Sequence, residues 1–108
     1  MVSGHDDLIR DVVRRIVQTA QPDKIILFGS RARGDARPDS DIDILVIQDS
    51  TEPGYRRDAA LYLALAGMNV PVDVITYTPE EVRDWSAVPQ AFITTVIREG
   101  IVVYENKG

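Results

Sequence analysis

Two short apolar segments, joined by a polar stretch rich in glycine, arginine and aspartate, constrain this chain most. Residues 24–28 (KIILF) and 42–47 (IDILVI) have the composition of buried strands, and the connection between them reads GSRARGDARPDSD. If the second strand begins at Asp41, the side chains of Asp41 and Asp43 point to the same face, with Cα atoms roughly 6.5 Å apart. The sequence therefore predicts two neighbouring carboxylates at the start of a strand.

Paired carboxylates of this kind suit hard divalent cations such as Mg²⁺, which take oxygen ligands and share them with substrate phosphates. Gly29 and Ser30 open a turn whose backbone N–H groups and hydroxyl can meet phosphate oxygens. A lone D-x-D is more often a solvated strand edge or a helix cap, and a lone Gly-Ser is an ordinary turn. The conjunction of a strand, GS, ten residues and DxD favours a site for a metal-bound nucleoside triphosphate.

Arg31, Arg33 and Arg37 make this connection the one locally basic stretch of the chain. Each could be a solvated arginine, or could pair with Asp35 or Asp39. We expect at least one of the three to bind phosphate or to anchor the loop, with Arg33 as the first candidate.

Composition limits the class of protein. The 108 residues suffice for a single domain over 1–108 with a modest core, and the net charge of −5 argues against a broad nucleic-acid-binding surface. The absence of cysteine excludes disulfides, thiolate zinc sites and cysteine nucleophiles. No apolar stretch reaches the length of a membrane helix, and MVSGHDDLIR lacks the pattern of a signal peptide. We expect a cytoplasmic protein that binds neither membranes nor nucleic acid directly.

Apolar periodicity and turn residues predict an alternation of helices and strands. We expect helices near residues 5–20, 55–67 and 89–98, a short helical turn over 30–36, and a short helix that Thr78 and Glu81 open as a capping box. We expect strands over 24–28, 41–48, 70–77 and 101–104. Together these elements predict an α/β domain of the α+β type, in which helices pack on a mixed sheet of about four strands.

The helix near residues 55–67 contains eight consecutive apolar residues, Ala59 to Ala66. A helix that is apolar all round is either buried or meets another chain. Alanine tolerated at the surface is an equally good explanation, and the sequence does not show which side faces outward.

Asp73 lies within the apolar strand predicted over residues 70–77. We expect it to be buried among apolar neighbours, where a carboxylate is costly unless it is paired or bound to metal. Two arrangements would remove that cost: a salt bridge to an arginine, or proximity to cations held by Asp41 and Asp43.

The pattern GS-x10-DxD, with the Ala32-Arg33-Gly34 triplet after the serine, resembles the nucleotidyltransferase superfamily related to DNA polymerase β. More narrowly, the chain resembles the minimal nucleotidyltransferases, the MNT-domain partners of HEPN proteins. The resemblance covers nearly the whole chain, because the length and the closing REGIVVYE are also typical.

This resemblance implies a nucleotidyltransferase fold and a magnesium-dependent transfer of AMP from ATP to a protein. It implies that Asp41 and Asp43 hold two Mg²⁺ ions, that Asp73 is the third catalytic and metal-binding acid, and that Gly29 and Ser30 hold the outer phosphates. The implied acceptor is a tyrosine of a helical HEPN toxin, so the chain would be the antitoxin of a toxin–antitoxin pair.

Two other functions remain open. The chain could be a binding module that blocks the same partner by contact without catalysis. It could also be the catalytic subunit of a small-molecule nucleotidyltransferase of the aminoglycoside type, although 108 residues leave no room for an acceptor-binding domain. The intact GS, DxD and Asp73 favour the enzyme.

Overall fold

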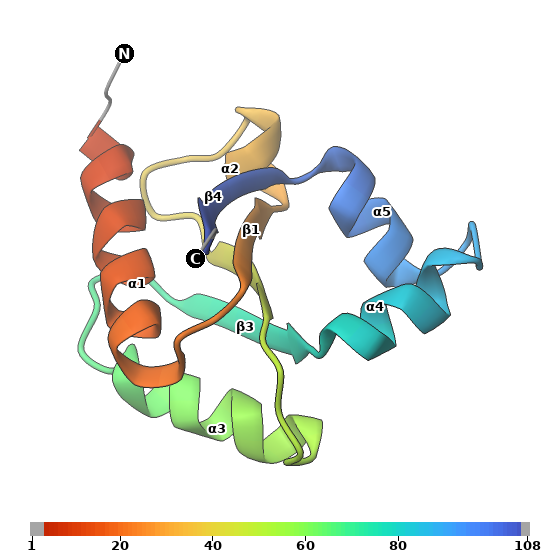
Figure 1. Ribbon diagram of the computed structural model, residues 1–108. Coiled ribbons are helices and arrows are strands. Elements are labelled where there is room, and N and C mark those ends of the chain that lie inside the picture. Colours follow the sequence, from red (N-terminus) through yellow and green to blue (C-terminus); the bar gives the residue numbers. More distant parts are fainter. Residues whose placement is uncertain (1–3, 107–108) are drawn as a thin grey trace.

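The computed structural model describes residues 4–106, with side chains from residue 7 onward, and places the strands of this part of the chain in one mixed sheet. The strands are β1 (Lys24–Phe28), β2 (Ile42–Ile47), β3 (Val72–Tyr77) and β4 (Ile101–Glu105), in the order β3-β2-β1-β4. β1 runs antiparallel to both β2 and β4, whereas β2 and β3 are parallel (Figure 1). The predicted mixed sheet is confirmed.

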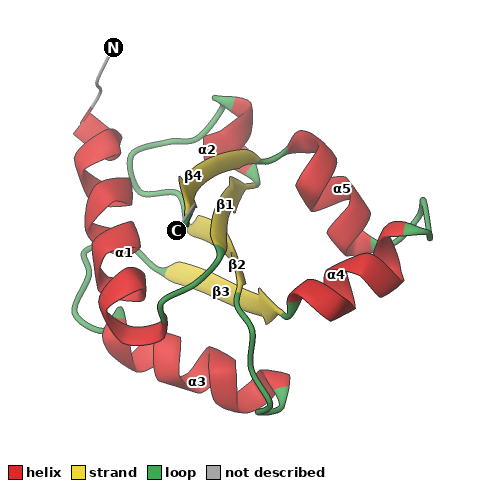
Figure 2. Cartoon of the chain, viewed as in Figure 1, coloured by secondary structure: helices red, strands yellow, loops and turns green. Residues whose placement is uncertain are grey.

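Helices lie on both sides of this sheet (Figure 2). They are α1 (Gly4–Ala20), α2 (Ser30–Arg33), α3 (Gly54–Ala64), α4 (Pro79–Ser86) and α5 (Phe92–Glu99). α1 and α3 pack on one face, and α4 and α5 lie on the other. Over residues 4–106, no helix is both long and apolar enough to cross a membrane.

The apolar side chains of β2 explain its central position. Ile42, Ile44 and Val46 join the core beneath α1 and α3, while Leu45 and Ile47 join the core beneath α5. All five are buried. A strand covered on both faces must be apolar on both, which is why its sequence lacks a simple alternation after Asp43.

Several element boundaries differ from the sequence prediction, and the short helical turn expected over 30–36 is α2, which ends at Arg33. β3 begins at Val72 rather than residue 70, α3 ends at Ala64 rather than residue 67, and α5 begins at Phe92 rather than residue 89. α3 is followed by a turn in which Gly67 has a φ of +84°, a conformation that glycine adopts without strain. Before α5, hydrogen bonds from Val88 N to Trp85 O and from Ala91 N to Val88 O close turns around Pro89.

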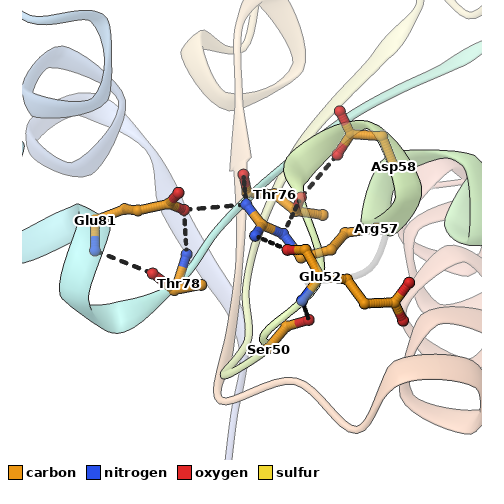
Figure 3. Close-up of polar contacts among 7 residues, drawn as sticks. All are labelled: Ser50, Glu52, Arg57, Asp58, Thr76, Thr78 and Glu81. Atoms are coloured by element: carbon orange, nitrogen blue, oxygen red, sulfur yellow. Dashed lines mark hydrogen bonds and ion pairs between the residues drawn. The ribbon is translucent and has the colours of Figure 1, made fainter.

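A polar network that the sequence did not reveal ties α3 to β3 and α4 (Figure 3). The buried guanidinium of Arg57 donates to Thr76 Oγ1 at 2.9 Å, to the Thr76 and Glu52 carbonyls at 3.2 and 2.8 Å, and to Glu81 Oε1 at 3.0 Å. Glu81 also completes the predicted capping box with Thr78. Because Thr76 lies at the carboxyl end of β3, this network stands away from Asp73 at the other end and is structural.

Candidate active site

Three carboxylates gather where β2 and β3 begin. The parallel register pairs Asp43 with Asp73, and Asp41 lies just before β2, two residues from Asp43. Asp43 and Asp73 share a side-chain hydrogen bond, and the charge of Asp41 acts on Asp43. The three acids predicted from the sequence are thus neighbours at one end of the sheet.

The expectation that Asp73 is buried is wrong. Its side chain is exposed, although Val72 and Val74 on either side of it are buried against the α1/α3 core. β3 is an edge strand, and Asp73 lies near its amino end on the opposite face. Asp73 forms no ion pair with an arginine or lysine among residues 7–106, so the salt-bridge alternative is absent there.

The pKa of the Asp43 carboxyl is raised above its ordinary value of 3.8. Burial is the main cause, followed by the negative charges of Asp73 and Asp41 and by the hydrogen bond that the protonated Asp43 carboxyl donates to Asp73, while the charge of Arg33 lowers it. Desolvation and like charges both disfavour the ionised carboxylate. A cation bound beside Asp43 would relieve both effects.

Gly29 lies directly against Asp43 because β1 and β2 pair antiparallel, with Phe28 opposite Asp43. Its φ of +76° and ψ of −155° belong to a region that only glycine occupies without strain. A Cβ built on Gly29 would overlap Asp43 Oδ2. The turn therefore requires glycine for two independent reasons, and Ser30 begins α2 immediately after it.

Substitution of Gly29 by alanine is expected to destabilise the fold by about 2–3 kcal/mol, because backbone strain adds to the overlap with Asp43. Gly34 is the matched control, since its φ is +84° but a Cβ there would meet no atom within 4 Å. Gly34→Ala should cost only about 1 kcal/mol. Urea unfolding measures both, and equal losses would contradict the close fit between Gly29 and Asp43.

The arginines of the loop divide into two roles. Arg31 is buried, and it donates to the Ser40 carbonyl at 3.1 and 2.7 Å and to the Pro38 carbonyl at 3.0 Å. It therefore anchors the segment that leads into Asp41. Arg33, our first candidate, is exposed and pairs with Asp35 at 3.3 Å, yet lies close enough to Asp43 to act on its pKa.

A hollow of about 190 Å³ lies beside Gly29, between α2 and α5. Arg33 lines it from α2, and Phe28 and Phe92 line it with rings in a T-shaped contact, their centroids 5.6 Å apart. The lining of this hollow thus combines two aromatic rings with one positive and one negative side chain, Arg33 and Glu99.

The chemistry of the three acids suits a divalent cation, but their side chains do not form a complete metal site in their present positions. Carboxylate oxygens are the ligands that Mg²⁺ prefers. Within residues 7–106, however, no three histidine, aspartate or glutamate side chains converge in a geometry that would hold a metal ion. Asp43 and Asp73 instead contact each other. Two carboxylate oxygens in contact can still bind one Mg²⁺, whose neighbouring ligands in an octahedron lie about 3 Å apart.

Comparison with known proteins agrees with this arrangement. A family model described as "Nucleotidyltransferase domain" matches residues 7–101. A protein of Methanocaldococcus jannaschii named "Putative protein adenylyltransferase" is 39% identical over 84 residues, which make up 75% of this chain and 77% of that protein.

Two crystal structures share the fold. A chain described as a "putative nucleotidyltransferase" from Sulfolobus solfataricus superposes with a TM-score of 0.66 at 24% identity, covering 94% of this chain and 82% of that one. A chain from a structure described as "the toxin-antitoxin with AMP-PNP" has a TM-score of 0.58 at 21% identity, covering 91% and 73%. At these identities the likeness concerns the fold alone.

Proposed function

This chain belongs to the nucleotidyltransferase domain family, and we propose that it transfers AMP from magnesium-bound ATP to a hydroxyl group of a partner protein. One observation carries the proposal: Asp43 and Asp73 stand in register on parallel strands, with Asp41 beside them and the Gly29–Ser30 turn against Asp43. The adenylyltransferase name of the Methanocaldococcus jannaschii relative supports the choice of AMP and of a protein acceptor.

In this proposal Asp41 and Asp43 hold Mg²⁺, with Asp73 completing the set of acids. Bound ions would neutralise charge on the attacking and leaving oxygens, as two-metal sites do in phosphoryl chemistry. The backbone of Gly29 and the Ser30 hydroxyl bind the outer phosphates, and Arg33 offers a further positive charge. The family generally uses a nucleoside triphosphate and a divalent metal, which supports this assignment.

The reaction also needs a base that accepts the proton of the acceptor hydroxyl, and we assign this role to Asp73. The acceptor hydroxyl oxygen attacks the α-phosphorus, the bond to the bridging oxygen of pyrophosphate breaks, and pyrophosphate leaves with that electron pair. The hydroxyl proton passes to the Asp73 carboxylate. Exposure of Asp73 favours this role, because a general base must come within hydrogen-bond reach of the acceptor.

We further propose that the acceptor is a helical toxin of the HEPN type and that this chain is its antitoxin. The toxin–antitoxin structure that shares the fold supports a protein partner. α3 offers a surface for it: Leu63 is 79% exposed, Tyr55 72% and Tyr62 45%, whereas Leu61 is buried. Apolar side chains exposed together in this way are typical of a contact with another protein.

Leu63→Glu is expected to weaken partner binding by at least tenfold while leaving the domain folded, because its side chain projects into solvent. Leu61→Glu, two residues away, should instead unfold the protein, since it would bury an unpaired charge. Circular dichroism and pull-down of the co-expressed partner separate the two effects. A folded Leu63→Glu protein with unchanged partner affinity would show that α3 is not the interface.

Incubation of this protein with Mg²⁺, a candidate helical protein of the HEPN type and ATP labelled at the α-phosphate tests the reaction. Label should appear on the acceptor from α-labelled but not from γ-labelled ATP. If Asp41→Asn/Asp43→Asn protein neutralises the toxin as well as the wild type does, contact alone suffices. Absence of label with a bound, folded partner would refute the proposed reaction.

A further inference from the structure

A second hollow lies away from the acids, between α1 and the β4 edge of the sheet, with a volume of about 470 Å³. α1 contributes one side of it, and β1, β4 and α2 contribute the other. Its apolar lining consists of Ile9, Val13, Leu27, Ile101 and Val103. The hollow exists because the core under α1 closes over β1 and β2, while β4 at the edge remains partly open, with Ile101 47% exposed.

The other lining side chains are three arginines, Arg10 and Arg14 from α1 and Arg31 from α2. Among residues 7–106, Arg10 pairs with the exposed Asp7 at 3.7 Å, and Arg14 pairs with Asp11 on the same helix. Arg10 and Asp7 are both exposed, and a pair of exposed side chains compensates charge weakly. In a chain whose net charge is −5, this hollow is therefore a local concentration of positive charge over an apolar floor.

Arg31 is the most informative of the three. It is 93% buried, and its hydrogen bonds go to the carbonyls of Pro38 and Ser40, so its positive charge faces no carboxylate among the residues described. Its Nη1 is buried without a hydrogen-bond partner within the same part of the chain. A buried charge and a buried donor both cost free energy when they are uncompensated. An anion in the hollow would lie near the Arg31 side chain and would compensate its positive charge.

From this combination we propose that the hollow binds a small amphipathic carboxylate, a ligand with an aliphatic body and one terminal carboxylate. Its volume and lining, mostly apolar with a few polar groups, are those of small-molecule sites. The aliphatic body lies on Val13, Ile101 and their apolar neighbours, and the carboxylate faces the arginines. This site is independent of the reaction proposed above, since none of its arginines is assigned to the acids or the phosphates.

Octanoate is a suitable probe, with 1-octanol and octylammonium as matched ligands of neutral and positive charge. Methyl-labelled protein titrated by NMR should show saturable octanoate-induced shifts at Ile9, Val13, Ile101 and Val103. Octanol should bind at least fivefold more weakly, and octylammonium should not bind. Arg31 is left intact, because its replacement would disturb the loop before Asp41.

Arg10→Gln/Arg14→Gln is expected to weaken octanoate binding at least fivefold. Arg83→Gln/Arg98→Gln, which removes the same charge from exposed positions on α4 and α5, should leave it unchanged. The proposal fails if octanol binds as tightly as octanoate, if octylammonium binds, if both double variants weaken binding equally, or if the shifts lie elsewhere. Loss of AMP transfer would not bear on this result.

Discussion

Asp43→Asn is expected to reduce AMP transfer by at least about 10²–10³-fold, the scale observed when one group that stabilises transition-state charge is lost. The expectation rests on the position of Asp43, which contacts both Gly29 and Asp73 and is the most buried of the three acids. The measurement is the rate of label transfer from α-labelled ATP. Asp39→Asn, an equivalent change at an exposed position in the same loop, should leave the rate unchanged.

The same variant should be more stable than the wild type when no cation is present. Because the fold raises the pKa of Asp43, the ionised carboxylate opposes folding, and this cost is present at neutral pH. It should disappear as pH falls below the ordinary value of 3.8, where the carboxyl is protonated in both states. We expect the variant to melt a few degrees higher at pH 7 without Mg²⁺, with the difference shrinking at low pH. A lower melting temperature at pH 7 would contradict the electrostatic account.

Asp73→Asn is expected to leave folding and Mg·ATP binding nearly intact while lowering AMP transfer by about two orders of magnitude or more, the scale of a lost general base. The substitution keeps size and shape but removes charge and basicity. Because Asp73 is exposed and forms no ion pair among residues 7–106, we expect no loss of melting temperature. Removal of its charge should also lower the pKa of Asp43.

Single-turnover transfer together with thermal unfolding separates the possible outcomes. Near-wild-type transfer by folded Asp73→Asn protein would refute its role as the base. A large drop in melting temperature would show a structural role that its surroundings do not indicate. Asp84→Asn, at an exposed position on α4, controls for the loss of one negative charge.

Much of the fold follows from local patterns in the sequence. KIILF and the apolar run after Asp43 identify β1 and β2, and burial of β2 on both faces explains why its composition lacks alternation. The connection and the start of β2 also indicate the candidate site, because glycine before serine and the pair Asp41 and Asp43 together suggest it. Strand order does not follow from such patterns, since it depends on contacts between distant segments.

The errors have physical reasons too. The apolar neighbours of Asp73 predict that it is buried, but an edge strand can bury one face while the start of its other face stays exposed. The eight consecutive apolar residues of the α3 region do not indicate which side of the helix faces the core. The buried side of α3 includes Arg57 and Leu61, four residues apart, and Leu65 directly after the helix continues this spacing. A charged side chain therefore lies on the buried side, which the apolar run alone does not reveal.

The choice between Arg31 and Arg33 could not be made from sequence, because α2 spans only four residues. With little more than one turn, no periodicity shows which side chain faces the sheet. Arg31 turns inward and holds the Ser40 carbonyl, whereas Arg33 remains exposed near Asp43. Arg33 therefore stays a candidate phosphate ligand, and the loop anchor is its neighbour two residues earlier.

Calorimetric titration of ATP with and without Mg²⁺ tests the central claim most directly, namely that these acids form a site for a metal-bound triphosphate. Neighbouring carboxylates repel one another unless a cation lies between them, so nucleotide and Mg²⁺ should bind together. We predict measurable ATP binding by the wild type only when Mg²⁺ is present, and none by the Asp41→Asn/Asp43→Asn protein. Equal affinity of the two proteins for Mg·ATP would contradict the account.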